Sequence, residues 1–110
     1  MAPATLLKTS DLNRFLVDMQ QKSYFNIYYN SLSVAGQNGT LQYRFYNSDI
    51  ANNFYGKTGF MSGVRSISGY LDTQSGSRLV VTIATNNYTI RTAAVDRIHQ
   101  QILDYLYSRY

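Results

Sequence analysis

Three strand-like runs in the second half of the chain constrain its fold more than any other sequence feature. They cover about 54–61, 64–73 and 78–85, and they are separated only by Ser62-Gly63 and by the four residues 74–77. Both connections are rich in Ser and Gly, which is typical of hairpin turns. Connections this short join neighbouring strands in antiparallel order. The sequence therefore predicts a three-stranded antiparallel sheet, whose third run is apolar on both faces and is expected to be buried on both sides.

A helix is predicted on each side of these runs. From Leu12 the apolar residues recur at i, i+3, i+4 and i+7, which indicates a helix over about 10–21. A last helix is predicted over about 92–108, with an inward stripe of Val95, Ile98, Ile102 and either Tyr105 or Leu106. The segments 23–35 and 40–46 have no clear period, and the shorter one fits a helix or a strand. The predicted architecture is α+β, with both helices packed on one face of the three-stranded sheet.

The composition bounds the classes of function. The 110 residues suffice for one domain, and 45% apolar against 15% charged residues is typical of a globular chain. The sequence has no cysteine, which excludes disulfides and Cys-ligated metals, and we predict neither a metal nor a cofactor. The net charge of +4 comes from scattered basic residues, whereas nucleic-acid surfaces cluster them, so no nucleic-acid partner is expected. We expect no transmembrane segment and no signal peptide, because no apolar run is long enough.

Three further patterns suggest other chemistry. Residues 51–58 approach a phosphate-binding loop, but that loop needs a buried strand before it and a helix after it, and glycines follow here. His99 is the single histidine, has no second imidazole to share a metal, and is interpreted as a helix-surface residue. Six tyrosines either line a binding groove or pack against the helices: Tyr24, Tyr28, Tyr29, Tyr43, Tyr46 and Tyr55. A groove would favour an alternative function, a non-catalytic module that binds glycan, peptide or nucleic acid.

Lys57-Thr58-Gly59 is the strongest concentration of chemistry in the sequence. It places a cation and a hydroxyl beside a glycine within a strand-like run. A cation, a hydroxyl donor and a backbone that can be approached closely are what a site needs to hold a carboxylate. Because three residues alone are a weak signal, their context carries the interpretation.

That context extends over most of the chain. The segment 32–44 runs Leu-Ser-Val-Ala-Gly-Gln-Asn-Gly-Thr-Leu-Gln-Tyr-Arg and follows a helix that begins after Ala2-Pro3-Ala4-Thr5. The motif itself is followed by Gly63-Val64, by Ser68-Gly69-Tyr70 and by the hairpin Ser75-Gly76-Ser77-Arg78-Leu79. In this order and spacing the sequence resembles the C-terminal segment of penicillin-binding type serine D-alanyl-D-alanine carboxypeptidases and endopeptidases, in particular the class C group.

The resemblance implies a role for each residue of the motif. Lys57 would hold the terminal carboxylate of the substrate and support the proton chemistry of the serine, which makes it the candidate catalytic residue. Thr58 would donate its hydroxyl to the same carboxylate, and Gly59 would let the substrate backbone lie against the strand. Phe60, where the family usually has Ser or Thr, would offer its backbone N–H to the oxyanion hole.

The resemblance also implies partners and a location for the intact enzyme. The sequence lacks the family's Ser-x-x-Lys and Ser-x-Asn motifs, so the chain is interpreted as a single C-terminal segment that is inactive alone. The parent enzyme would be a periplasmic or otherwise extracytoplasmic hydrolase that cleaves peptidoglycan stem peptides and is acylated by β-lactams. In the family the third strand pairs with a distant strand, so here its open edge at 79–85 is expected to pair with another copy and to give a homodimer or aggregates.

Overall fold

The computed structural model of the chain describes residues 9–41, 45, 48–61, 64–86 and 92–110. Its elements in chain order are α1 (Thr9–Met19), α2 (Phe25–Ser31), β1 (Ser33–Val34), the 3-10 turn η2 (Gly39–Leu41), β2 (Phe54–Met61), β3 (Val64–Asp72), β4 (Arg78–Asn86) and α3 (Thr92–Arg109). The predicted α+β class is confirmed, and both predicted helices and all three predicted strands are present within two residues of their expected bounds.

The strands form one antiparallel sheet in the order β1-β2-β3-β4. β2 pairs with β3 from Phe54, opposite Leu71, to Met61, opposite Val64, and β3 pairs with β4 along its length. The predicted meander is therefore confirmed, and β1 adds a fourth strand. Because β1 has only two residues, it is too short to produce an alternating pattern that could be recognised in the sequence.

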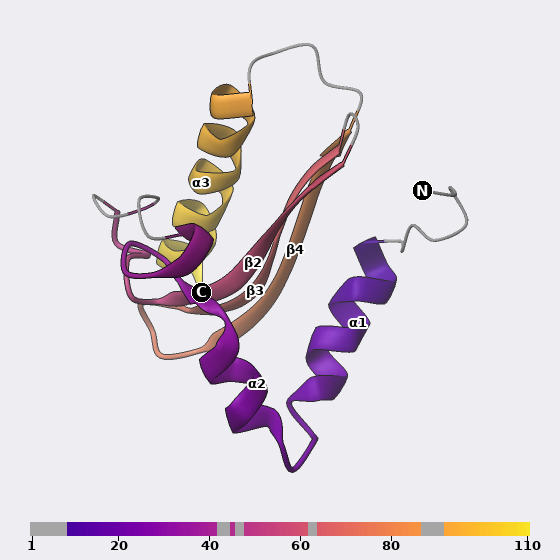
Figure 1. The fold of residues 1–110 in the computed structure, drawn as a ribbon. Coiled ribbons are helices and arrows are strands. Elements are labelled where there is room, and N and C mark those ends of the chain that lie inside the picture. The colour runs from indigo at the N-terminus through magenta and orange to yellow at the C-terminus, as the bar shows by residue number, and fades with distance from the viewer. Residues whose placement is uncertain (1–8, 42–44, 46–47, 62–63, 87–91) are drawn as a thin grey trace.

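The first and last helices lie on opposite faces of the sheet, so the prediction of one shared face is wrong (Figure 1). On one face, Ile67 and Leu71 of β3 pack in a cluster with Leu103 of α3. On the other face, Tyr70 packs with Leu16 of α1 and donates its hydroxyl to the Leu16 carbonyl at 2.7 Å. Successive strand residues point to opposite faces. Since Leu71 and Tyr70 point to opposite faces and both are fully buried, each face has its own covering layer.

The buried side of α3 also differs from the predicted stripe. Val95, His99 and Leu103, spaced four residues apart, are at most 1% exposed. Ile98 and Ile102 of the predicted stripe are exposed instead. Of the two alternatives for its last member, Tyr105 is exposed, whereas Leu106 packs against the core. The Nε2 atom of His99 lies 2.9 Å from Oγ1 of Thr85 on β4. This hydrogen bond lets a polar ring occupy a core position, so the prediction of a surface histidine is wrong.

Helix α2 lies in the segment 23–35, where the sequence predicts no element. None of the residues of α2 is fully buried, so the helix has no apolar stripe that a periodicity argument could detect. The undecided segment 40–46 contributes Leu41, which is fully buried, to the end of η2. Within that segment, residues 42–44 and 46 lie outside the described part of the chain.

Candidate functional site

Lys57, Thr58 and Gly59 lie in β2 at the point where the sheet loses its outer strand. β1 pairs with β2 only at Gly56 and Tyr55. Beyond these pairs, from Lys57 onward, the outer edge of β2 has no partner strand among the residues that the structure describes. Unpaired N–H and C=O groups on a strand edge can pair with an extended peptide. The motif therefore lies on an edge where a peptide strand can be added.

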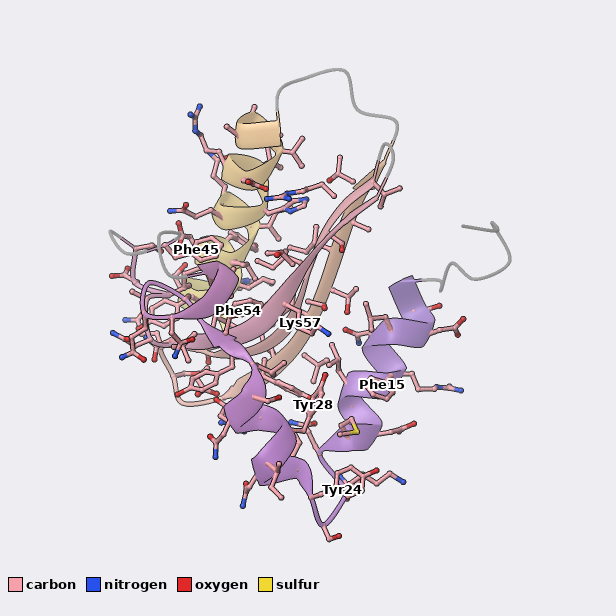
Figure 2. All side chains as sticks on the ribbon, in the orientation of Figure 1. Phe15, Tyr24, Tyr28, Phe45, Phe54 and Lys57 are labelled. Atoms are coloured by element: carbon pink, nitrogen blue, oxygen red, sulfur yellow. The ribbon has the colours of Figure 1, made fainter. Side chains whose placement is uncertain are left out.

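Two adjoining pockets, of about 240 and 230 Å³, open on this edge. Lys57 and Thr58 line both pockets, as do Tyr28 and Leu32. The first pocket is completed by two serines of the α2–β1 region, Ser31 and Ser33. The second extends over the sheet toward α1 and is completed by Leu12, Phe15, Leu16, Gly59, Ser66, Ser68 and Gly69. Figure 2 shows Lys57 pointing from the sheet toward α1, with Phe15 and Tyr28 on the two helices that flank this space.

The charge at these pockets is positive. The side chain of Lys57 is exposed, and Thr58 is half-buried beside it. Within the described residues, no acidic side chain lines either pocket. The ammonium group is therefore available to an anionic ligand, and a carboxylate held by an ammonium and a hydroxyl would receive two hydrogen bonds, one of them charge-assisted.

Gly59 and Phe60 continue the motif along the strand. A Cβ atom at Gly59 would lie 2.6 Å from Oγ of Ser66, so a side chain there would intrude on the second pocket. The backbone of Phe60 belongs to β2 and lies opposite Arg65 of β3. The side chain of Phe60 lies outside the described part of the chain.

Aromatic contacts hold α2 over the sheet beside the pockets. The rings of Tyr29 and Tyr55 stack at 4.2 Å, with planes 12° apart, and the guanidinium of Arg78 lies 4.7 Å from the centre of the Tyr29 ring. Burial raises the pKa of Tyr29 to about 12; the Asp72 carboxylate adds to this and Arg78 opposes it. Tyr29 and Tyr55 are thus half-buried and packed against each other, whereas Tyr28 lines both pockets.

The remaining tyrosines of the predicted groove are not seen to line either pocket. Tyr24 is 52% exposed and lines neither pocket, and Tyr43 and Tyr46 lie outside the described residues. Sequence reasoning missed the contribution of Phe15, which it assigned to the core-facing stripe of a helix. It also missed Ser66 and Ser68, which lie opposite Gly59 and Lys57. The two serines are two residues apart in a predicted strand, and this spacing, which places both hydroxyls on one face, was the available signal.

Some site types are absent from the described ranges. No group of three or more His, Cys, Asp or Glu side chains there could hold a metal ion. None of the helices described there is both long and apolar enough to cross a bilayer. The sequence also contains no Ser-x-x-Lys motif, so the pockets hold a cation and hydroxyls but no serine nucleophile of that type.

Comparisons with known proteins agree on one family. The sequence model of the D-Ala-D-Ala carboxypeptidase 3 (S13) family matches residues 3–109. Penicillin-sensitive carboxypeptidase A of Dictyostelium discoideum is 31% identical over 100 residues, which cover 80% of this chain and 19% of that protein.

Solved structures give the same fold. Penicillin binding protein 4 (dacB) from Haemophilus influenzae superposes with a TM-score of 0.74 at 18% identity, over 87% of this chain and 23% of that one. A structure of the same protein complexed with a β-lactam gives a TM-score of 0.73 at 18% identity, over 89% and 24%. The chain thus spans about a fifth of the curated relative and about a quarter of the solved chains.

Proposed function

The chain belongs to the D-Ala-D-Ala carboxypeptidase 3 (S13) family, and we propose that it is the C-terminal portion of a serine D-Ala-D-Ala carboxypeptidase or endopeptidase. In this proposal it supplies the strand that holds a peptidoglycan stem peptide, and the serine nucleophile belongs to another part of a longer polypeptide. The observation that carries the proposal is that Lys57 and Thr58 line both pockets beside an unpaired strand edge.

The substrate would be held by its terminal carboxylate and by its backbone. An extended peptide would pair with the free edge of β2 and bring the carboxylate to Lys57 and Thr58, which would both donate to it. Gly59 would leave space for the peptide backbone. The N–H of Phe60 would donate to the scissile carbonyl oxygen as it becomes an oxyanion, a contribution typically worth ~3 kcal/mol.

The bond-breaking step would depend on the serine. Its Oγ would attack the carbonyl carbon of the penultimate D-Ala, the C–N bond would break, and the terminal D-Ala would leave with a protonated amine. Water would then hydrolyse the acyl-serine ester. Lys57 would support the proton transfer from the serine. The parent enzyme would act outside the cytoplasm and be acylated by β-lactams, whereas this chain alone would be inert.

The proposal is tested with the chain and a Lys57→Ala variant. Incubation with a chromogenic β-lactam and with an N-acetylated D-Ala-D-Ala peptide is expected to give no adduct by mass spectrometry and no turnover. NMR titration with the same peptide is expected to shift amides of β2, and Lys57→Ala should weaken this binding at least tenfold. The control is Lys22→Ala, which removes an exposed lysine that lines neither pocket.

Three outcomes would count against the proposal. A covalent adduct or turnover by the chain alone would show that the site is complete without another segment. Equal binding by the wild type and Lys57→Ala would remove the role of Lys57. Saturable binding of peptidoglycan fragments or single-stranded oligonucleotides that survives Lys57→Ala would favour the non-catalytic binding module instead.

Homodimerisation through the edge of β4 stays a separate prediction. Among the described residues no strand pairs with the outer edge of β4. Helix α1 lies close to this strand, because Thr82 Oγ1 donates to Asn13 Oδ1 at 3.0 Å. An open strand edge can pair with a second copy, so we expect dimerisation or aggregation through it at high concentration. Analytical ultracentrifugation that detects only the 12.6 kDa monomer at every concentration would contradict it.

A further inference from the structure

Tyr28 differs from the neighbouring tyrosines between the helices and the sheet in how its hydroxyl is engaged. The Tyr70 hydroxyl donates to the Leu16 carbonyl at 2.7 Å. The Tyr29 hydroxyl accepts from the Arg78 guanidinium at 3.3 Å. The Tyr28 hydroxyl has no hydrogen-bond partner among the described residues, although the residue lines both pockets. This hydroxyl is therefore free to bind a ligand there.

The ring of Tyr28 is held in place by aromatic contacts. It meets Phe15 of α1 edge to face, with ring centres 6.2 Å apart and planes at 87°. The next residue, Tyr29, stacks on Tyr55 of β2 at 4.2 Å. Tyr55 and Lys57 are two residues apart on the same strand, so their side chains share one face of the sheet. These contacts hold Tyr28 next to the space into which Lys57 points (Figure 2).

The surroundings of Tyr28 make its hydroxyl a hydrogen-bond donor and not a base. Burial raises the pKa of Tyr28 above its ordinary value, because a phenolate there would lose contact with water. Of the described side chains that line the pockets, Lys57 carries a positive charge and none carries a negative one. A carboxylate can accept from a phenol and an ammonium together, and hydrogen bonds to an ionised acceptor are roughly twice as strong as neutral ones.

We propose that Tyr28 is a ligand-binding residue whose hydroxyl donates a hydrogen bond to the terminal carboxylate of the bound peptide, beside Lys57 and Thr58. The inference rests on the proposed function, because it needs that carboxylate in the pockets that all three residues line. The two oxygens of a carboxylate accept about four hydrogen bonds, so a third donor does not compete with the first two. Tyr28 then favours a peptide with a free carboxylate over one whose end is neutral.

The test compares N-acetyl-D-Ala-D-Ala with the same peptide capped as its C-terminal carboxamide. The two peptides differ only in the group that Tyr28 would contact. NMR titration gives the dissociation constants for the wild type and for Tyr28→Phe, which removes the hydroxyl and keeps the ring that meets Phe15. Tyr28→Phe is expected to weaken binding of the carboxylate peptide about tenfold. The carboxamide peptide should lose less than about threefold, because a neutral acceptor forms a weaker hydrogen bond.

Two further variants serve as controls. Tyr24→Phe removes a hydroxyl from a tyrosine that is 52% exposed and lines neither pocket, so it should leave both affinities unchanged. Lys57→Ala should weaken the carboxylate peptide, as the proposed function requires. Circular dichroism and urea unfolding establish that each variant is folded before its affinities are compared.

The outcomes separate this inference from the proposed function. If the carboxylate peptide binds in a Lys57-dependent way and Tyr28→Phe binds it as tightly as the wild type, the role of Tyr28 is refuted and the carboxylate site stands. Equal losses for the two peptides in Tyr28→Phe would show that the hydroxyl contacts another part of the peptide, which also refutes the inference. If neither peptide binds at millimolar concentration, both proposals fail.

Discussion

Gly56 and Gly59 occupy the same strand, yet the structure needs glycine at each for a different reason. A Cβ atom at Gly56 would lie 2.3 Å from the Ser68 carbonyl oxygen and 2.6 Å from the Phe54 ring. These neighbours are backbone and a fully buried ring, which cannot move aside cheaply. At Gly59 the contact within 4 Å is with Oγ of Ser66, the end of a short side chain that can rotate.

This difference predicts unequal effects of the same substitution. Gly56→Ala should lower the free energy of unfolding by roughly 2 kcal/mol or more, because it overpacks the β2–β3 pair. Gly59→Ala should lower it by less than about 1 kcal/mol, since Ser66 can adopt another rotamer. Urea denaturation monitored by circular dichroism measures both values. Equal losses in the two variants would show that Ser66 is not free to rotate.

At the scale of elements, α3 is oriented by its polar contacts with the sheet as much as by its apolar residues. His99 approaches Thr85 on β4, and Asp96 accepts two hydrogen bonds from Arg65 on β3, at 2.9 and 3.1 Å. These contacts bring the Val95–His99–Leu103 side to the sheet. Ile98 and Ile102 consequently remain partly in water, although they are more apolar than histidine.

We predict that His99→Ala destabilises the chain by about 2–4 kcal/mol, because it leaves a cavity between α3 and β4 and removes the hydrogen bond to Thr85. Alanine favours helix, so the loss would come from packing and not from helix propensity. The matched control is Gln101→Ala, at an exposed position two residues further on, which should change stability by less than about 0.5 kcal/mol. A His99→Ala loss as small as that of the control would place His99 outside the core.

At the scale of the whole molecule, the two faces of the sheet are covered by layers of different character. The α3 face is mainly aliphatic, whereas the face under α1 and α2 is rich in tyrosine and phenylalanine. Tyr70 ties the second layer to the sheet through its hydroxyl bond to Leu16, and Phe25 packs edge-on against it, with ring centres 5.3 Å apart. This layer also carries one wall of both pockets, so its integrity affects the candidate site.

The aromatic layer should make stability fall in alkali. Burial raises the pKa of Tyr70 to about 12, with a smaller contribution from Tyr28 and opposition from Arg78. A tyrosine whose pKa is raised on folding favours the folded state fully below its unfolded pKa, which is about 10. That contribution is lost as the pH rises through about 12. The free energy of unfolding should therefore decline between these two pH values.

Tyr70→Phe isolates this effect. The variant should lose about 1 kcal/mol at neutral pH with the hydrogen bond to Leu16, and its decline in alkali should be shallower than that of the wild type. Tyr24→Phe, at a half-exposed site, serves as the control and should keep the wild-type profile. Urea unfolding at a series of pH values measures all three proteins, and parallel curves for wild type and Tyr70→Phe would refute the prediction.

The sequence by itself determined the meander, the two flanking helices and the location of Lys57-Thr58-Gly59 on a strand. Short turns and alternating apolar residues act between neighbours in the chain, so their effect can be recognised without the fold. Only the tertiary structure decided that α1 and α3 cover opposite faces and that His99 faces inward. It also decided that the pairing of β1 with β2 stops at Gly56, one residue before Lys57. The contacts responsible join residues far apart in the chain: Thr85 and His99 are 14 residues apart, and Leu16 and Tyr70 are 54 apart. Local patterns carry no information about such pairs, because each depends on how complete elements pack.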